Sequence, residues 1–173
     1  MEIVSCPRVL ISGTQSAVGK GFITAGLIYA LQNMGLSVSL AVKGPHILRA
    51  SFYKRIIGRP VSIIDPFILT TDQMLYSIYF SSLGADLMLI LGESGVFDSY
   101  EPKFQHEIES DFAFASLVKA GILLVHKAEY LSESITAAAF GFENYKKKQI
   151  NLVAHIANFL EQIPLPDQID TIK

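Results

Sequence analysis

Short, almost continuous hydrophobic runs alternate along this chain with longer amphipathic segments. Runs of the first kind are typical of strands that helices cover on both faces, whereas helices repeat a hydrophobic residue every three or four positions. Strands are therefore expected at residues 9–12, 37–42, 87–91, 122–126 and 150–156. Helices are expected at residues 20–34, 70–83, 105–119 and 132–146. The alternation predicts the α/β class, with a doubly wound, mostly parallel sheet.

Composition and charge limit the kinds of partner that can be expected for this chain. Half of the 173 residues are hydrophobic, and the formal net charge is −2 without a long run of one sign. No electrostatic feature therefore favours nucleic acid or an anionic membrane as a partner. The lone cysteine, Cys6, excludes a disulfide scaffold and a thiolate metal cluster and favours a cytoplasmic location. Asp86, Gly92 and Glu93 interrupt the best candidate for a membrane span, so none is expected.

The length suits one domain with a sizeable buried core. We expect that domain to cover residues 1–160. Residues 161–173 contain Pro164, Pro166 and several polar residues, which is typical of a terminal extension or a linker.

A glycine-rich turn follows the first expected strand and precedes the first expected helix. Such a turn can point backbone N–H groups at phosphates, the helix N-terminus adds positive potential, and the lysine reaches the β- and γ-phosphates. Lys20 is thus the candidate catalytic group. The alternative is a degenerate loop that keeps the shape without the ligand. The expected phosphate-binding residues are Gly13, Thr14, Gln15, Ser16, Ala17, Val18, Gly19, Lys20 and Gly21.

Two details of this phosphate loop depart from the usual motif. Five residues separate Gly13 from Gly19, one more than in the plain spacing. Gly21 stands where a serine or threonine normally ligates Mg²⁺. The hydroxyl of Thr14, Ser16 or Thr24, or a water molecule, would have to replace that ligand.

The loop and the residues after it resemble one family. The long P-loop is similar to that of cobyrinic acid a,c-diamide synthase and dethiobiotin synthetase, and the later motifs, in their order and spacing, resemble the first of these. Those motifs are Gly44-Pro45, Phe52, Gly58-Arg59-Pro60, Asp65-Pro66, Asp86-Leu87, Gly92, Gly95, Phe97-Asp98, Ser134, Gly141-Phe142 and Asn158. The resemblance covers residues 8–160 and implies a P-loop NTPase-like three-layer sandwich. It further implies a cytoplasmic, ATP- and Mg²⁺-dependent ligase of cobalamin biosynthesis that phosphorylates substrate carboxylates and replaces the phosphate with ammonia.

Three departures from the family pattern affect the metal and substrate positions. His46 and Arg49 replace two aspartates, and Leu91 aligns with the acidic metal ligand at the end of the third strand. Glu93 could replace that ligand only if the strand end were reshaped, and Asp98 could hold a metal-bound water. Since Mg²⁺ requires near-octahedral oxygen coordination, its binding is doubtful and the ligase activity is expected to be weakened or lost.

The remaining candidate residues each allow two interpretations. His46, Arg49 and Lys43 are either an anion-binding mouth for a substrate or solvated loop residues. Asn158 resembles the adenine-recognising asparagine of relatives, and a strand-end cap is the alternative. His126 and His155 lie in apolar strands and are interpreted as hydrogen-bonded core residues.

The leading hypothesis is thus an ATP-binding domain of the cobyrinic acid a,c-diamide synthase type. The alternatives are an active carboxylate ligase or dethiobiotin-like synthetase with rearranged metal ligands, and a non-catalytic binding or regulatory module. No glutamine amidotransferase domain is expected within the chain, so ammonia would come free or from a separate amidotransferase. The resemblance also implies a homodimer.

Overall fold

The computed structural model describes residues 6–99, 110–129, 131–145 and 150–159. In them a single six-stranded sheet has the order β3-β2-β4-β1-β5-β6, and every neighbouring pair is parallel. The strands are β1 (Arg8–Gly13), β2 (Val38–Lys43), β3 (Ser62–Ile64), β4 (Leu87–Gly95), β5 (Gly121–Lys127) and β6 (Leu152–Asn158). The helices are α1 (Lys20–Asn33), α2 (Ile47–Ile57), α3 (Thr71–Ser82), α4 (Asp111–Leu117) and α5 (Ser134–Asn144).

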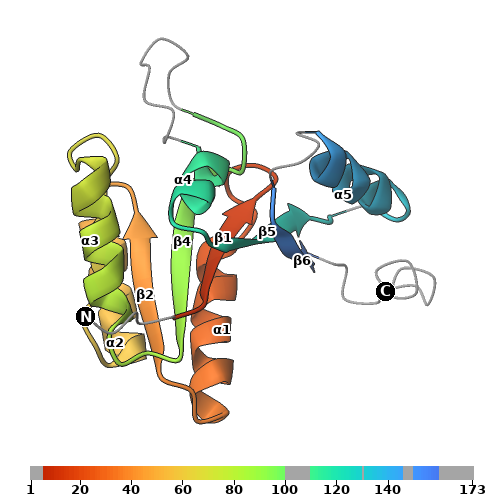
Figure 1. The fold of residues 1–173 in the computed structure, drawn as a ribbon. Coiled ribbons are helices and arrows are strands. Elements are labelled where there is room, and N and C mark those ends of the chain that lie inside the picture. Colours follow the sequence, from red (N-terminus) through yellow and green to blue (C-terminus); the bar gives the residue numbers. More distant parts are fainter. Residues whose placement is uncertain (1–5, 100–109, 130, 146–149, 160–173) are drawn as a thin grey trace.

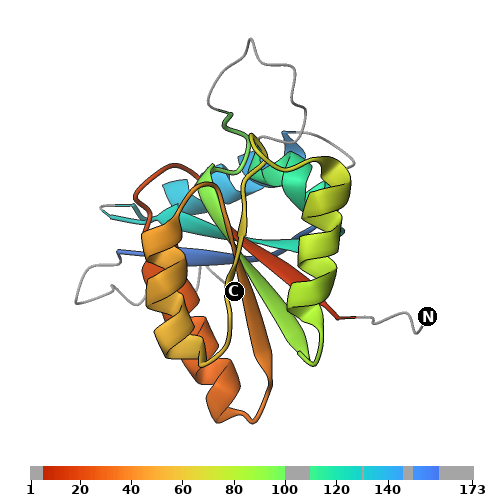
Figure 2. The same cartoon turned by 90° about the vertical axis from the view of Figure 1, so that its left-hand side faces the viewer.

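Helices cover both faces of the sheet. Helices α1 and α2 pack together on one face, and α3 lies on the other (Figures 1 and 2). The chain runs from β1 to β3 in one direction across the sheet, then turns back through β4, β5 and β6. Right-handed crossovers place the helices of the two directions on opposite faces, so the turning point lies between β1 and β4. The predicted doubly wound α/β sandwich is confirmed.

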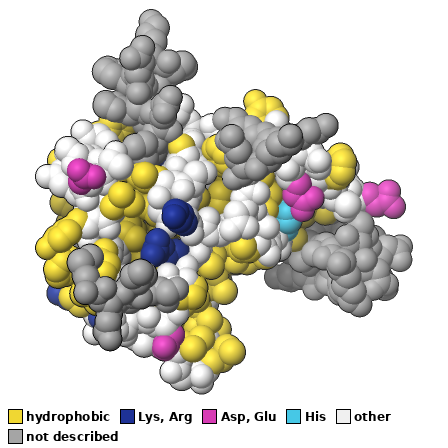
Figure 3. Space-filling view, in the orientation of Figure 1, with side chains coloured by type: hydrophobic (Ala, Val, Ile, Leu, Met, Phe, Trp, Pro, Cys, Tyr) yellow, Lys and Arg dark blue, Asp and Glu magenta, His cyan; other side chains and the backbone are white. Residues whose placement is uncertain are grey.

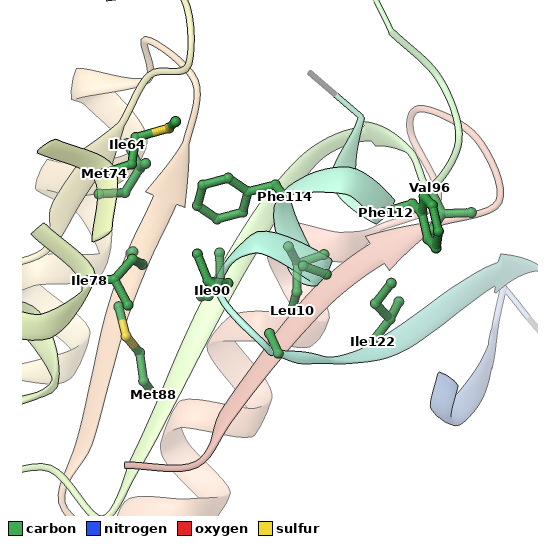
Figure 4. Close-up of a cluster of buried hydrophobic side chains, with 14 of the residues drawn as sticks. Leu10, Ile64, Met74, Ile78, Met88, Ile90, Val96, Phe112, Phe114 and Ile122 are labelled. Atoms are coloured by element: carbon green, nitrogen blue, oxygen red, sulfur yellow. The ribbon is translucent and has the colours of Figure 1, made fainter. Parts of the chain in front are cut away.

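The hydrophobic core has two parts, one on each face of the sheet. The part under α3 and α4 contains side chains such as Leu10, Met74, Ile90 and Phe114 (Figure 4). The part under α1 and α2 contains side chains such as Ile28, Leu40 and Leu91. Successive residues of β1 and β4 alternate between the two parts, which is why the central strands are continuously hydrophobic.

Local signals fix several helix ends. Helix α3 begins with a capping box in which the Thr70 hydroxyl accepts from the Gln73 N–H and the Gln73 side chain accepts from the Thr70 N–H. Helix α2 ends at Gly58, whose φ of 74° lies in the left-handed region that glycine adopts readily.

Hydrophobic side chains are exposed on the outer surface over α3 (Figure 3). Tyr76 and Phe80 are among the exposed hydrophobic residues of this helix.

The predicted elements are present with small shifts, and two elements were missed. Helix α2 and strand β3 were not predicted, and β4 continues four residues beyond the expected end at residue 91. Helix α4 begins at Asp111. Residues 105–109 of the predicted helix, residue 146 of the last predicted helix and the extension at residues 161–173 lie outside the described residues. No helix within the described ranges is long and apolar enough to cross a membrane.

Candidate functional site

The phosphate loop connects the carboxyl end of β1 to the first turn of α1. The Thr14 N–H donates to the Val125 carbonyl (2.9 Å), and Val18 is fully buried beneath the loop. The backbone takes left-handed φ values at Ala17 (60°) and Gly19 (85°) before the helix begins. Residues 14–19 are therefore anchored at one end by β5 and at the other by α1.

Both glycines of the motif are needed for packing. A Cβ atom on Gly13 would lie 2.6 Å from Val18 Cγ2, and one on Gly19 would collide with the amide nitrogen of Asn158. That amide donates to the Val18 carbonyl (2.9 Å), so Asn158 caps the loop from the end of β6. This contact supports the interpretation of Asn158 as a strand-end cap, whereas its recognition of adenine stays a prediction.

Lys20 lies where its ammonium group can meet phosphate oxygens. Its Nζ donates to the Ser94 carbonyl of β4 (2.6 Å), and only 7% of the residue is exposed. Burial lowers the pKa of Lys20, and the charge of Asp111 opposes that shift. A phosphate would supply the negative charge that this buried ammonium lacks at close range.

A cavity of about 440 Å³ opens beside the loop. Its lining includes Lys20 from the loop, Arg49 from α2 and Glu93 from β4, together with apolar side chains of α2. Seven of the fourteen predicted site residues thus line one cavity at the carboxyl edge of the sheet: Ala17, Val18, Gly19, Lys20, Gly21, Arg49 and Glu93. This is the edge, next to the turning point of the strand order, where ligands of doubly wound folds bind.

Tyr53 of α2 occupies the space beside Gly21. Its hydroxyl donates to the Gly21 carbonyl (2.7 Å) and would lie 3.1 Å from a Cβ atom at that position. Burial raises the pKa of Tyr53, and Arg49 opposes this shift. Thr24 does not replace the missing loop hydroxyl, because it is buried and donates to the Lys20 carbonyl (2.8 Å).

Glu93 is placed by the continuation of β4 and faces His46. His46 Nε2 and Glu93 Oε1 are 3.1 Å apart, and both side chains are largely buried. The Glu93 carboxylate also lies against Gly44, where an added Cβ atom would come within 2.8 Å of it. Strand β4 extends past Leu91 to Gly95, so Glu93 lies within the strand, and its role as a metal ligand stays a prediction.

Asp111 links three strands behind the cavity, and sequence reasoning missed it. Its carboxylate accepts from Ser12 Oγ (2.7 Å), Lys43 Nζ (3.0 Å) and the Glu93 N–H (3.2 Å). Lys43 is accordingly a buried ion-pair partner, and both earlier interpretations of it, a mouth residue and a solvated loop residue, are wrong. The only local signal was an aspartate in the first turn of a helix, whereas its partners lie 18 to 99 residues away.

Asp98 lies against Gly95, and its charge, like that of Asp111, opposes the lowering of the Lys20 pKa. It lines a second cavity with Phe97, Phe142 and Tyr145, so the structure does not bring it into the cavity that contains Lys20.

His126 and His155 form a hydrogen-bonded chain with Glu143. His126 Nε2 is 2.8 Å from His155 Nδ1, and His155 Nε2 is 3.1 Å from Glu143 Oε1. Burial, and after it the neighbouring His155, lowers the pKa of His126 to about 4. Both histidines are therefore hydrogen-bonded, His126 is buried as expected of a core residue, and His155 is half-buried.

Among the described residues, Glu93 is the only acidic residue that lines the cavity containing Lys20. Across the same residues, no group of three or more His, Cys, Asp and Glu side chains is arranged to hold a metal ion. At nucleotide sites Mg²⁺ is usually held by one or two carboxylates together with phosphate oxygens and water, and Glu93 is the one carboxylate in the lining of this cavity, so Mg²⁺ binding stays a prediction.

Comparisons with known proteins identify relatives in sequence and in fold. No family model matches the chain. It is 32% identical to cobyrinate a,c-diamide synthase of Archaeoglobus fulgidus over 137 residues, which are 79% of this chain and 30% of that protein. Against the synthase of Magnetococcus marinus it is 33% identical over 135 residues, 78% of this chain and 28% of that protein. The chain thus spans about a third of the length of these curated relatives.

Solved structures with the same fold share little sequence with it. Chloroplast FtsY from Physcomitrella patens superposes with a TM-score of 0.57 at 14% identity, covering 90% of this chain and 50% of that one. FtsY from Elizabethkingia anophelis in complex with GDP gives a TM-score of 0.55 at 15% identity, covering 90% and 49%. These likenesses show the fold, which is that of P-loop NTPases. Over most of its own length, this chain is a relative of the cobyrinate a,c-diamide synthases, as its sequence motifs predicted.

Proposed function

We propose that the chain binds ATP through the loop of residues 13–21 and presents its γ-phosphate to the carboxylate of a small substrate. The position of Lys20 carries this proposal: a buried ammonium group at the start of α1, beside a cavity at the carboxyl edge of the sheet. The sequence relatives are named cobyrinate a,c-diamide synthases, and a name that describes diamide formation supports the same class of reaction.

The reaction that fits is phosphoryl transfer followed by amide formation. A substrate carboxylate oxygen attacks the γ-phosphorus, ADP leaves, and ammonia then displaces phosphate from the acyl phosphate. In such reactions the protein contributes mainly position and neutralisation of charge. Lys20 would neutralise the phosphates, and the exposed guanidinium of Arg49, at the rim of the cavity, would attract the substrate carboxylate. The altered residues around Glu93 lead us to expect slow turnover.

Calorimetry with ATP tests the binding step. Wild-type protein should bind ATP, and Lys20→Ala should weaken binding at least about tenfold, because a charge-assisted contact contributes roughly 1.5–3 kcal/mol. Lys54→Ala is the matched control, since Lys54 is an exposed lysine in the last turn of α2. Equal affinity of the Lys20 and Lys54 variants would reject the placement of the phosphates.

Turnover separates a ligase from a non-catalytic binding module. ATP hydrolysis that a carboxylate substrate stimulates, together with amide product when ammonia is added, would support the ligase. ATP binding without hydrolysis under any substrate condition would favour the binding module.

The proposed partners are an ammonia source, either free ammonia or a glutamine amidotransferase, and a second copy of this chain. The exposed apolar side chains of Leu48 and Phe52, which line the cavity, support an interface at this edge. Light scattering should give a dimer mass for the wild type and a monomer mass for Phe52→Glu. A wild-type monomer at all concentrations would reject the homodimer.

A further inference from the structure

We propose that the cavity containing Lys20 accepts a small acid with one carboxylate and an apolar body, and that Leu48 and Phe52 of α2 select this class of substrate. The proposal deepens the function proposed above and rests on a nucleotide bound at residues 13–21. It names the kind of molecule whose carboxylate would meet the γ-phosphate.

One face of helix α2 forms a wall of this cavity. Leu48, Arg49, Phe52 and Tyr53 all line it. Positions four residues apart lie on the same side of a helix, so Phe52 follows Leu48 along the wall and Tyr53 follows Arg49. The Phe52 and Tyr53 rings meet edge to face with their centroids 5.2 Å apart. Since the Tyr53 hydroxyl donates to the Gly21 carbonyl (2.7 Å), the wall is tied to the phosphate loop.

Two side chains of this wall are apolar and yet open to solvent. Leu48 is 86% exposed and Phe52 is 57% exposed. Val18 and Leu91, which line the same cavity, are buried and add apolar surface opposite the helix. A triphosphate gains nothing from contact with such surfaces, whereas the hydrocarbon part of a second ligand would be stabilised by covering them. The wall therefore fits the body of the substrate rather than the nucleotide.

The cations of the cavity can hold one carboxylate besides the phosphates. Among the described residues, Lys20 and Arg49 are the basic residues in its lining. Burial is the main cause of the lowered pKa of Lys20, and the positive charge of Arg49 adds to it, so the two groups act on each other. Arg49 forms no ion pair within the described part of the chain. With Lys20 at the phosphates, the Arg49 guanidinium remains to bind a carboxylate through paired hydrogen bonds.

A second carboxylate on the substrate would find no partner. Glu93 lines the cavity as well, and its Oε1 is 3.1 Å from His46 Nε2, so it carries its own partner into the site. An additional substrate anion would be repelled by Glu93 or would lie against the apolar wall, which cannot solvate it. Unsatisfied groups of this kind are a common source of specificity.

The volume of the cavity limits the size of the acid. It measures about 440 Å³, whereas small-molecule sites span roughly 300–1,000 Å³. The γ-phosphate would occupy part of this space. We therefore expect a short aliphatic or aromatic acid.

Calorimetry with a matched pair of acids tests this preference. Hexanoate and hexanedioate have the same chain length and differ by one carboxylate. Each is titrated in the presence of Mg²⁺ into protein saturated with the β,γ-imido analogue of ATP, so the measurement requires no turnover. Hexanoate should bind at least about tenfold more tightly, because hexanedioate loses apolar contact and adds an unpaired charge.

Leu48→Arg should reverse the order of the two acids, because it places a second guanidinium on the wall. Ile47→Arg is the matched control, since Ile47 is the neighbouring residue, is 68% exposed and does not line this cavity. It should keep the wild-type order. Both residues lie at the proposed dimer edge, but loss of a dimer contact would not reverse a preference between acids.

Arg49→Gln should weaken the binding of hexanoate at least about tenfold, because it removes the charge that pairs with the carboxylate. Arg55→Gln, in the exposed last turn of the same helix, should leave that affinity unchanged.

Three results would overturn the substrate proposal and leave the nucleotide site intact. They are binding of the ATP analogue without binding of hexanoate, an affinity for hexanedioate that equals or exceeds that for hexanoate, and a Leu48→Arg protein that keeps the wild-type order. Absence of binding of the ATP analogue itself would overturn the nucleotide proposal and this one with it.

Discussion

Asp111 is a buried carboxylate that connects β1, β2 and β4 behind the phosphate loop. It is inaccessible to solvent and forms an ion pair with Lys43, which is also buried. Its carboxylate also fills the space above Gly92, where any larger residue would collide with it. A buried charge is tolerated only when it is paired and hydrogen-bonded, so these residues depend on one another.

Asp111→Asn should destabilise the fold by about 3–5 kcal/mol, because it removes one charge of the buried Asp111–Lys43 ion pair. Urea denaturation measures the change. Asp72→Asn, in the exposed first turn of α3, is the control and should cost less than about 1 kcal/mol. A double variant with Lys43→Met should recover much of the stability that Asp111→Asn loses. A loss below 1 kcal/mol for Asp111→Asn would contradict the buried pair.

Alanine substitutions at Gly19 and at Gly26 should change the stability of the protein in opposite directions. Gly19→Ala introduces a Cβ atom that collides with Asn158 at a left-handed φ of 85°, so it should destabilise the loop and weaken ATP binding. Gly26→Ala lies in α1 with nothing within 4 Å of the added atom, and should stabilise the protein by about 0.5–1 kcal/mol. Thermal unfolding of the two variants checks the contrast. A stable Gly19→Ala protein with unchanged ATP affinity would show that the loop is not held as described.

At the scale of helices and strands, the sequence predicts those elements that a local pattern of residues encodes. Buried strands are recognisable as continuous hydrophobic runs, and the phosphate loop is recognisable from a motif of adjacent residues. Helix α2 was missed because it buries only Ala50, Tyr53 and Ile57 and follows Gly44-Pro45, which indicated a loop. The end of β4 was missed because Glu93 and Ser94 are polar and a bulge against β1 breaks the simple register.

The same limit explains which site residues were found. Lys20 belongs to a local motif, whereas Tyr53 reaches Gly21 across 32 residues of sequence and Asp111 reaches Ser12 across 99. Contacts of this range depend on the order of strands in the sheet. Hydrophobic periodicity does not specify that order.

Tyr53→Phe should loosen the contact between α2 and the phosphate loop. The variant removes the hydrogen bond from the Tyr53 hydroxyl to the Gly21 carbonyl, a loss of about 1 kcal/mol in the free energy of unfolding. Denaturant titration measures it, and Tyr76→Phe, on the exposed side of α3, should be neutral. Equal stabilities of the two variants would mean that this hydroxyl does not hold α2 to the loop.

The whole molecule should lose stability on acidification through His126. Its pKa is about 4 in the folded protein and about 6.5 in an unfolded chain. Between these values the unfolded chain binds more protons, so the free energy of unfolding falls as the pH falls from about 6.5 to 4, by up to about 3 kcal/mol. Urea denaturation across this range should show a shallower pH dependence for His126→Gln than for the wild type. Identical slopes would contradict a buried, neutral His126.

In the molecule as a whole, we expect ATP phosphates to bind at the loop between β1 and α1. Backbone amide chemical shifts, followed by nuclear magnetic resonance during an ATP titration, test it most directly. We expect the largest changes on residues 13–21, with smaller ones at Gly92 and Glu93 across the cavity. Changes centred instead on Phe97, Phe142 and Tyr145 around the second cavity, with residues 13–21 unaffected, would contradict it.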